Sequence, residues 1–375
     1  MAQVERILIV GGGIAGLTLA TALHQQGFEA ELVEGRQDWQ AVGAGIAVQP
    51  NGMRVLRTLG LFSAVEQAGT VIRQWDFCDQ QGTTLCETNL ETLWGEVGPF
   101  IGIARTKLHE VLRAGAAAVP TKLGTSLVSL TQDECRVRVG LSDGAVNTYD
   151  LVVGADGIVS TVRRLSLSAT PPVYAGQMVW RGLAPIRSKG VTRLEFFGGE
   201  GCFFGLCPVG DRQTYGFGNV TMPRFHDALP GRLSRLRERF AAFGGAVKQY
   251  LAALSSDEQL HCSPIEWVEQ VVWGRGRVVL IGDAAHASSP MMGQGGSLAM
   301  EDAWVLAEGL REAESVEEAL ETFVNRRRPR VEWVRQHSRM VAESFALPPS
   351  MRNATLRERG DQLLRVRFEP LKAAV

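Results

Sequence analysis

The feature that most constrains the fold of this chain is a glycine turn near its N-terminus. A short apolar run, Arg6 to Val10, has the composition of a buried strand and leads directly into Gly11 to Gly16, which reads GGGIAG. Apolar residues then recur at helical spacing up to Gly27, and Glu29 to Glu34 has the pattern of a second strand. A strand, a helix and a strand in this order form a βαβ unit, and such units build parallel sheets.

The glycine turn also predicts a ligand. Its spacing is G-x-G-x-x-G, in which the first glycine permits a tight turn, the second lets the backbone approach a pyrophosphate and the third lets helix and strand pack closely. The free N–H groups of the following helix favour phosphate. Glu34 closes the second strand, where an acid can accept hydrogen bonds from ribose hydroxyls. These features predict a dinucleotide site but leave open whether the dinucleotide is FAD or NAD.

A second glycine-rich segment, Arg277 to Ala303, bears on that choice. It reads RVVLIGDAAHASSPMMGQGGSLAMEDA, so a strand delivers Gly282 and Asp283, a loop with Pro290 follows, and Gly293 to Gly296 opens a helix. An aspartate there suits a ribityl hydroxyl, and a glycine-rich helix start suits the pyrimidine end of a flavin, where reduction places negative charge. A plain strand–loop–helix crossover needs none of this glycine and proline, so the segment favours FAD.

Length and charge narrow the class of protein. The 375 residues are enough for two domains, and a formal net charge of -1 gives no reason to expect nucleic acid or an anionic membrane as a partner. No apolar run reaches the roughly 18 residues of a membrane span, and the N-terminus lacks the pattern of a signal peptide. The six cysteines show no C-x-x-C spacing, so we expect reduced thiols, no metal site and a cytoplasmic protein.

The C-terminal part of the chain has a mainly helical pattern. Ser315 and Glu318 have the spacing of a capping box and predict the start of a helix. A basic cluster within that helix favours a solvated helix face, with docking of a partner as the weaker alternative. The cluster consists of Arg326, Arg327, Arg328 and Arg330.

Between the two glycine-rich segments the chain is mainly strand-like. Short alternating runs flank the turn Ser142-Asp143-Gly144 and predict a hairpin, and aromatic residues and glycine turns recur from Val173 to about Val220. The sequence therefore predicts an α/β fold in which a Rossmann-like FAD-binding domain carries an inserted β-sheet substrate domain (an α+β insert) and a helical C-terminus. The expected bounds are residues 1–72, 99–170 and 265–330 for the FAD-binding domain, 73–98 and 171–264 for the substrate domain, and 331–375 for the C-terminal helical segment.

Three segments in this order carry a resemblance. The chain resembles the p-hydroxybenzoate hydroxylase-type (single-component, class A) FAD-dependent monooxygenases, and among them it is most similar to the salicylate, 3-hydroxybenzoate and urate hydroxylase-like members. The ending GQGGS departs from the commoner GQGxN, which affects the details of that turn. The matching segments are GGGIAG at Gly11–Gly16, DLVVGADGIVSTVR at Asp150–Arg163 and the segment Arg277–Ala303, with smaller matches at Gly43–Gly52 (GAGIAVQPNG) and Ile103–Leu112 (IARTKLHEVL).

The resemblance implies an activity. It implies a monooxygenase that binds FAD, is reduced by NADH or NADPH as a transient co-substrate, and uses dioxygen to hydroxylate a small aromatic or heteroaromatic substrate through a flavin C4a-hydroperoxide. Other readings stay open: a flavoenzyme of the same fold that performs epoxidation, N-oxidation or another redox reaction on a secondary metabolite, and a non-catalytic FAD-binding protein. A monomer or a homodimer fits equally well.

The resemblance also assigns cofactor contacts by position. Arg105 would reach the ribityl–pyrophosphate region, although an arginine that merely opens a surface helix is the plain alternative. Asp156 and Gly157 belong to a motif that the family shares between FAD and the nicotinamide cofactor, whereas Arg163 would meet either a phosphate or a carboxylate. The expected cofactor contacts are Gly11, Gly13, Ile14, Ala15, Gly16, Glu34, Gly35, Arg36, Gly45, Arg105, Leu127, Asp156, Gly157, Gly282, Asp283, Pro290, Gly293, Gly295, Gly296 and Ser297.

Substrate and catalytic residues are expected mainly in the inserted region. Arg181 could bind a substrate carboxylate or face solvent, and Tyr215 resembles a substrate-contacting tyrosine of the urate hydroxylase-like members but also suits a core position. His286, inside the second glycine-rich segment, is expected to be held by backbone hydrogen bonds. The predicted catalytic residues are Arg181, Tyr215 and Pro290, and the predicted substrate contacts are Trp180, Phe196 and Phe204, of which the two phenylalanines also suit a plain β core.

Overall fold

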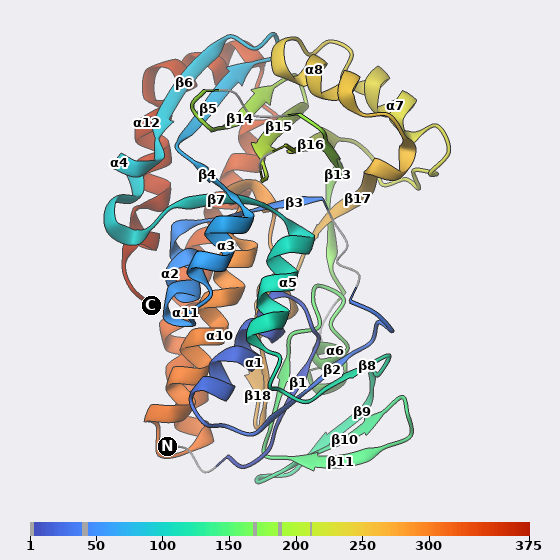
Figure 1. The fold of residues 1–375 in the computed structure, drawn as a ribbon, viewed down its shortest axis with the longest axis vertical. Helices are drawn as coiled ribbons and strands as arrows, with labels where there is room; N and C mark the ends of the chain where they lie inside the picture. The colour runs from blue at the N-terminus through green and yellow to red at the C-terminus, as the bar shows by residue number, and fades with distance from the viewer. Residues whose placement is uncertain (1–3, 40–43, 168–170, 187–189, 211) are drawn as a thin grey trace.

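The computed structural model describes residues 4–39, 44–167, 171–186, 190–210 and 212–375. Two large β-sheets lie one above the other in Figure 1, and a small sheet separates them. Long helices run along one side of both layers. The expected mixed α/β architecture is confirmed, because a parallel sheet with flanking helices carries a second sheet built largely from antiparallel pairs.

The lower sheet is formed around β1 (Ile7–Val10), which is buried along its whole length. It pairs in parallel with β2 (Ala30–Glu34) and with β12 (Leu151–Gly154), and α1 (Ile14–Gln25) connects β1 to β2. The predicted βαβ unit is therefore confirmed. The remaining strands of this sheet are β8 (Thr121–Leu123), β19 (Val278–Leu280) and β18 (Gly274–Arg275), in the order β18-β19-β12-β1-β2-β8.

Two three-stranded sheets accompany the parallel sheet. The first lies at its edge, and the turn at Gly144, with φ of 87°, connects two of its strands as the predicted hairpin. The second lies between the two large sheets in Figure 1. The strands of the first are β9 (Leu127–Gln132), β10 (Val137–Leu141) and β11 (Val146–Tyr149), and those of the second are β3 (Gly45–Val48), β7 (Phe100–Ala104) and β4 (Thr70–Ile72).

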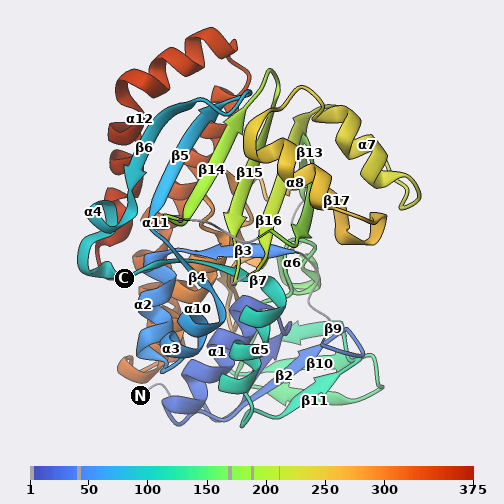
Figure 2. The same cartoon turned by 45° about the horizontal axis from the view of Figure 1, so that its top comes forward.

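The upper sheet has seven strands from three separate parts of the chain. Figure 2 shows these strands side by side, with α12 (Pro349–Lys372) along one edge and α7 (Arg232–Arg239) and α8 (Gly245–Ala253) over one face. The strand order is β17 (Leu260–Trp267), β13 (Val173–Ala184), β16 (Thr214–Thr221), β15 (Cys202–Pro208), β14 (Arg193–Gly198), β5 (Gln74–Asp79) and β6 (Thr84–Asn89).

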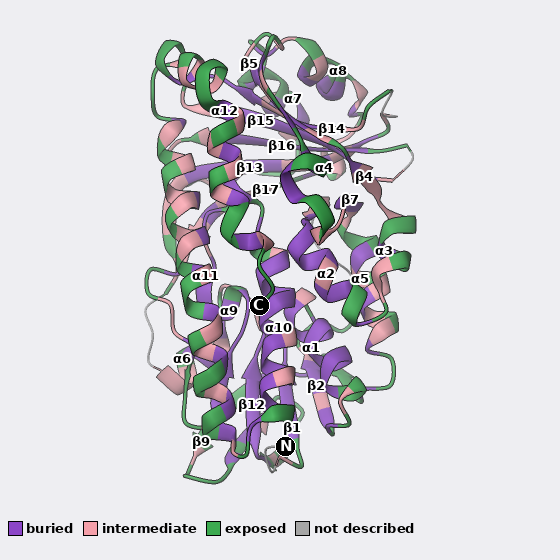
Figure 3. Cartoon of the chain, turned by 90° about the vertical axis from the view of Figure 1, so that its left-hand side faces the viewer, coloured by how far each residue is buried: buried purple, intermediate pink, exposed green. Residues whose placement is uncertain are grey.

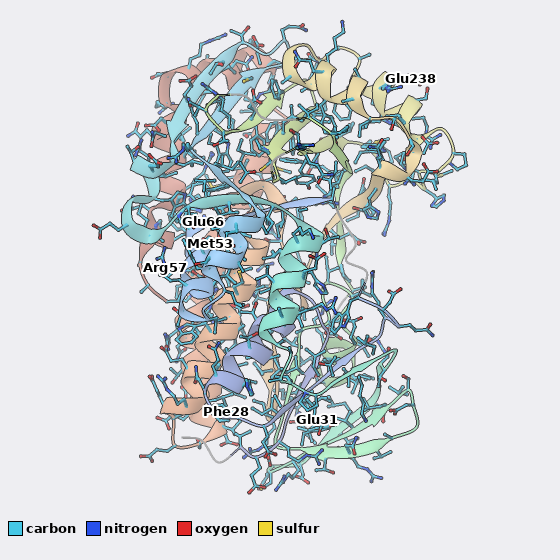
Figure 4. The ribbon with its side chains drawn as sticks, in the orientation of Figure 1. Phe28, Glu31, Met53, Arg57, Glu66 and Glu238 are labelled. Atoms are coloured by element: carbon cyan, nitrogen blue, oxygen red, sulfur yellow. The ribbon has the colours of Figure 1, made fainter. Side chains whose placement is uncertain are left out.

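Helices close the remaining sides of the molecule. On α2 (Pro50–Thr58), Met53 is fully buried while Arg57, one turn further, is exposed, and Figure 4 labels both side chains. Such a periodic division of apolar and polar residues is what packs a helix onto a core. The other helices are α3 (Phe62–Ala68), α4 (Leu90–Trp94), α5 (Arg105–Gly115), α6 (Thr161–Leu167), α9 (Asp283–His286), α10 (Gly295–Glu312) and α11 (Val316–Ser344).

Helix α11 begins where the capping box predicts. The Ser315 side chain accepts a hydrogen bond from the Glu318 N–H, and the Glu318 carboxylate accepts one from the Glu314 N–H. Figure 3 shows exposed residues along the outward faces of α11 and α12. The expected solvated face of the arginine cluster is nevertheless wrong for Arg327, which is fully buried. Helix packing places Arg327 against the carboxylates of α10, and this pairing replaces solvation.

The predicted division into domains, with its bounds, stays a prediction. Strands of the upper sheet come from residues 74–89, 173–221 and 260–267, and strands of the parallel sheet come from residues 7–34, 121–154 and 274–280. None of the helices in the described part of the chain is long and apolar enough to span a membrane.

Candidate active site

The N-terminal glycine turn is shaped by close backbone approaches. Gly11 has φ of 109°, and a side chain there would place its Cβ 2.5 Å from the Ala155 carbonyl oxygen. At Gly16 a Cβ would lie 1.9 Å from the Gly11 carbonyl oxygen, so this position requires glycine for the packing of helix on strand. A Cβ on Gly13, in contrast, would meet nothing within 4 Å. The turn therefore presents open space beside the helix start.

The start of α1 has the chemistry of a phosphate site. Its N-cap is Gly13, and neither a capping side chain nor an acidic residue of the first turn satisfies its first N–H groups within the described chain. Ile14, Ala15 and Gly16 follow at the first helical positions. Uncapped N–H groups and the positive end of the helix favour an anion such as a pyrophosphate.

Glu34 lies directly beside this turn. One carboxylate oxygen accepts a hydrogen bond of 2.7 Å from the Gly12 N–H, and the other accepts one of 2.9 Å from the Arg36 N–H. Gly35 and Arg36 follow on the exposed side of the strand end. A carboxylate offers about four acceptor positions, so Glu34 retains capacity for ribose hydroxyls while it fixes the turn. The ribose contact itself stays a prediction.

The second glycine-rich segment meets the first one at Gly282. This residue has φ of 59°, and a Cβ there would lie 3.2 Å from the Cβ atoms of both Ala15 and Ala299. Helices α1 and α10 therefore approach each other across a glycine. Asp283, the next residue, is exposed and lines a cavity. Like α1, α10 begins without a side-chain cap or an acidic first turn in the described chain.

A cavity of about 620 Å³ lies between this segment and the upper sheet. Seven residues that were predicted as cofactor contacts line this cavity: Gly45 of β3, Arg105 of α5, and Asp283, Pro290, Gly293, Gly295 and Gly296 of the segment. His286, Ser288 and Ser289 of the segment line it as well. The upper sheet contributes Trp75, Val179, Arg181, Leu194, Phe196, Phe203, Cys207, Tyr215, Phe217, Asn219, His261, Ser263 and Ile265.

These residues fit FAD. Two helix starts, at Gly13 and Gln294, have neither a side-chain cap nor an acidic first turn and so favour negatively charged groups, and the Asp283 carboxylate lines the cavity between segment and sheet. The Ser289 hydroxyl, buried in the same wall, has no hydrogen-bond partner among the described residues. A buried polar group without a partner beside a cavity indicates a group that a ligand satisfies.

Strand alternation decides which predicted substrate residues reach the cavity. Phe196 on β14 lines it and stacks on Trp75, with ring centroids 5.4 Å apart. Trp180 and Phe204 point to the other face of the sheet, where both are 1% exposed and pack under α7 and α8. The expected substrate contact of Trp180 and Phe204 is therefore corrected, because successive side chains of a strand point to opposite faces.

Arg181 and Tyr215 do face the cavity. The Arg181 guanidinium donates a hydrogen bond of 2.8 Å from Nη1 to the Ser263 hydroxyl. Tyr215 packs on Gly45, where a Cβ would lie 2.5 Å from the tyrosine ring. Burial raises the pKa of Tyr215, and the positive charges of Arg181 and Arg105 oppose this shift. Tyr215 is thus a protonated donor at neutral pH, and its catalytic role stays a prediction.

His286 differs from its expected environment. Instead of a backbone carbonyl, its ring Nε2 meets the Asp302 carboxylate at 2.6 Å. Asp302 is fully buried and also accepts hydrogen bonds from the Gly282 N–H and from Nε of Arg327. Despite the opposing effect of burial, the charges of His286 and Arg327 lower the pKa of Asp302 to about 2. This ionised carboxylate on α10 explains why a histidine is held here.

Four further residues of interest lie outside the cavity wall. The Asp156 carboxylate accepts hydrogen bonds from Ser160 and from the N–H groups of Thr161 and Val162, so it caps α6. Arg163 donates to the carbonyl oxygens of Ile158 and Ala284, and its expected contact with a phosphate stays a prediction. The other two are Leu127, buried in the main core, and Ser297, whose hydroxyl accepts a hydrogen bond from the Gln49 N–H.

Asp156, Gly157, Leu127 and Ser297 do not line the cavity, and their contacts with the cofactor stay predictions. Gly157 has φ of 75°, the left-handed conformation that favours glycine. The resembling segment at residues 43–52 begins at Gly43, which lies outside the described residues. Sequence reasoning missed His261, Ser263 and Asn219, all of which line the cavity from β17 and β16.

Two glycine-rich segments on one parallel sheet, with an aromatic cavity beneath a second sheet, define an FAD-dependent oxidoreductase. The chain belongs to the family described as FAD binding domain, which matches residues 5–184 and 252–338. Within this family it is a class A flavin monooxygenase, as its relatives are FAD-dependent monooxygenases of aromatic and heteroaromatic compounds.

The similarity extends over most of the chain. It is 36% identical to the aurachin C monooxygenase/isomerase of Stigmatella aurantiaca, over 80% of this chain and 79% of the relative. It is 32% identical to an FAD-dependent urate hydroxylase of Klebsiella pneumoniae, over 87% of this chain and 86% of the relative. The structure of Klebsiella pneumoniae HpxO complexed with FAD and uric acid matches with a TM-score of 0.90 at 27% identity, over 98% of this chain and 96% of that chain.

Proposed function

We propose that this monooxygenase hydroxylates a small aromatic or heteroaromatic substrate, with NADH or NADPH as the reductant and dioxygen as the oxygen source. One observation carries the proposal: the 620 Å³ cavity has the glycine-rich cofactor segment on one side and a wall of aromatic rings with one arginine on the other. A cavity of this size is within the range of small-molecule sites.

Residues in and beside the two glycine-rich segments would hold FAD. The start of α1 would hold the pyrophosphate, Glu34 the adenosine ribose, and Asp283 with the start of α10 the ribityl and pyrimidine part. Bound FAD supplies the redox chemistry, which takes electrons from the nicotinamide and activates dioxygen. The chain itself binds, orients and shields the reacting groups.

The aromatic wall would orient a planar substrate. Phe196, Phe203 and Phe217 contact one another with centroid distances between 5.4 and 6.2 Å, so their rings form a continuous surface. Aromatic pairs favour offset or edge-to-face contacts, which a substrate ring can extend. Because these side chains are apolar, they also exclude water from the reacting carbon.

Arg181 would anchor the polar edge of the substrate. A guanidinium can bind a carboxylate or an enolate through two parallel N–H groups, and Arg181 uses Nη1 for Ser263. Relatives named for urate and for 3-amino-4-hydroxybenzoate act on rings with acidic polar groups. A substrate that combines an aromatic ring with an acidic or hydrogen-bonding edge is therefore the class we propose.

The test is a substrate screen on the FAD-loaded protein. Phenolic acids, heteroaromatic acids, quinolones and purines are added singly, and NADH and NADPH oxidation, hydrogen peroxide and product mass are measured. We expect at least one compound to accelerate nicotinamide oxidation and to gain one oxygen atom. Stoichiometric hydrogen peroxide without an oxygenated product, for every compound, would contradict the proposal. Bound flavin that neither nicotinamide reduces, even with ligand present, would contradict it as well.

A further inference from the structure

The polar end of the cavity contains a histidine beside Arg181. We propose that His261 is the base that removes a proton from a ring O–H or N–H group of the substrate, while Arg181 stabilises the anion that remains. The inference rests on the proposed function and adds the chemical nature of the substrate: an aromatic ring whose hydroxyl or lactam group is acidic.

The fold places the two residues together. Arg181 on β13 and His261 on β17 are directly opposite each other in the antiparallel pairing of these strands. Opposite residues of such a pair point to the same face of the sheet, with their Cβ atoms about 5 Å apart. Both side chains line the cavity, and Ser263, two residues beyond His261, accepts the Arg181 hydrogen bond on that same face.

His261 also has a route for the proton to leave. Strand β17 is the edge strand of the upper sheet, and His261 is exposed although it lines the cavity. One side of the imidazole can therefore meet a substrate while the other meets water. A base in a fully enclosed position would need a separate relay to release its proton.

The charges around His261 favour its neutral form. Partial desolvation lowers the pKa of His261, and the positive charges of Arg181 on β13, Arg232 on α7 and Arg105 on α5 lower it further. At neutral pH the imidazole is unprotonated and can accept a proton. The same positive charges that disfavour the imidazolium favour an anionic substrate, so the transfer becomes easier on the substrate side.

Other ionisable groups of the cavity wall are engaged or unsuitable. Glu266 pairs with Arg224 at 3.1 Å, and His286 is held by Asp302. Burial raises the pKa of Cys207 to about 12 and raises the pKa of Tyr215 as well, so both stay protonated at neutral pH. Asp283 lies on the opposite, cofactor side of the cavity. Among the described residues that line the cavity, this leaves His261 as the base beside Arg181.

The step balances without a further reactant. The ring O–H or N–H bond breaks, its proton moves to a ring nitrogen of His261, and its electron pair stays on the substrate as an oxyanion or amide anion. The imidazolium then loses the proton to water at the exposed edge. The negative charge increases the electron density of the ring, so a ring carbon becomes a better nucleophile toward an electrophilic oxygen atom.

A binding experiment tests this without turnover. The FAD-loaded protein is titrated with 4-nitrophenol, 2-nitrophenol and 4-nitrocatechol, whose coloured anions report ionisation, and difference spectra are recorded across pH. In the unchanged protein the bound phenol should ionise at a lower pH than in water. In Arg181→Gln this midpoint should move back by about one pH unit or more, a tenfold change in the ionisation equilibrium, because the charge that stabilises the anion is lost. His261→Gln should leave the midpoint in place, since the base has already passed its proton to water. His24→Gln, at the exposed end of α1, is the matched control and should leave the midpoint unchanged.

A kinetic comparison gives an independent decision. With a substrate from the screen whose acidic group is protonated at pH 7, His261→Gln should lower kcat by about 100-fold or more, the usual contribution of a general base. A ring-nitrated analogue that is already ionised at pH 7 should be turned over by the variant at nearly the normal rate.

The possible outcomes separate the two proposals. Equal losses of kcat for both substrates in His261→Gln would overturn the role of His261, and an ionisation midpoint that Arg181→Gln leaves in place would overturn the role of Arg181. If none of the nitrophenols binds, the kinetic comparison decides alone. If the unchanged protein oxygenates no compound of the screen, it is the proposed function that fails.

Discussion

The ring Nε2 of His286 lies 2.6 Å from the Asp302 carboxylate, and this contact joins the flavin-side loop to helix α10. The same carboxylate accepts the Gly282 N–H, one residue before Asp283. Arg327 on α11 donates to Asp302 at 2.7 Å and to Glu301 at 2.9 Å. A single buried carboxylate therefore fixes both ends of the turn that carries Asp283 and connects it to the C-terminal helices.

Replacing Asp302 by asparagine should destabilise the protein strongly. The change leaves Arg327 buried without one of its two carboxylates, and loss of one partner of a buried ion pair costs about 3–5 kcal/mol. Urea denaturation of the apoprotein measures the free energy of unfolding. Glu312→Gln, at an exposed pair with Arg311, is the control and should change this free energy by less than about 0.5 kcal/mol. Similar stability for the two variants would refute the role of Asp302.

The stability contributed by Asp302 should also depend on pH. Its folded-state pKa of about 2 lies below the value of about 3.9 expected for an unfolded aspartate. A depressed pKa contributes stability that is present above pH 4 and is lost as pH falls from about 4 to about 2. The contribution is roughly 2–3 kcal/mol. The difference in unfolding free energy between the normal protein and Asp302→Asn should be smaller at pH 2.5 than at pH 5. An equal difference at the two pH values would count against this assignment.

Asp283→Ala should weaken FAD retention. The exposed carboxylate in the cavity is the group we expect to accept a ribityl hydroxyl, and a hydrogen bond to a charged group contributes about 1.5–3 kcal/mol, or roughly 10- to 100-fold in affinity. The flavin content after gel filtration and a fluorescence titration of the apoprotein measure this. Glu312→Ala serves as the control. Equal flavin content in the two variants would mean that Asp283 does not hold the cofactor.

Arg181→Ala should raise the substrate KM by about 10- to 100-fold with little change in the unfolding midpoint, because the guanidinium faces the cavity and not the core. Steady-state kinetics and thermal unfolding are measured together. Arg239→Ala, on the opposite face of the sheet over Trp180, should leave KM unchanged. A collapse of stability with an unchanged KM would make Arg181 a structural residue.

The two faces of the upper sheet predict opposite phenotypes for two phenylalanines. Phe204→Ala creates a void in the cluster under α7 and α8 and should cost about 3–5 kcal/mol of unfolding free energy. Phe196→Leu, on the cavity face, should raise KM while stability falls by less than half as much. Unfolding curves and KM values for both variants test this contrast. A higher KM for Phe204→Ala than for Phe196→Leu would reverse the assignment of faces.

The cofactor side could be predicted from the sequence because its determinants are local. Gly16 is required by its approach to Gly11 within the same turn, and Gly11 and Gly282 have positive φ, a property of their own backbone, so the glycine spacing records these requirements. The capping box at Ser315 is local in the same way. The confirmed strand–helix–strand unit followed from periodicity alone.

The substrate side could not be predicted with the same certainty because it depends on which face each strand presents. The β13–β17 pairing shifts register between Tyr174 and Met178, so the direction of Trp180 and Arg181 cannot be counted from the start of the strand. Strand β17 itself contains Pro264, which a sequence pattern reads as a break but an edge strand tolerates. His261 was missed for this reason. The partners of Arg327 and His286 lie on another helix and depend on packing.

The parallel pairing of β5 with β14 has a consequence for the growing polypeptide. Strands β5 and β6 are synthesised before every other strand of the upper sheet, so β5 can pair with β14 only after about a hundred further residues have been made. The cover of β6 comes from α12, the last helix to be made, whose Gly360 lies close against Cys86. Pairings this far apart in the chain form slowly. The contact of α12 with β6 can thus form only at the end of biosynthesis, after both large sheets already have all their strands.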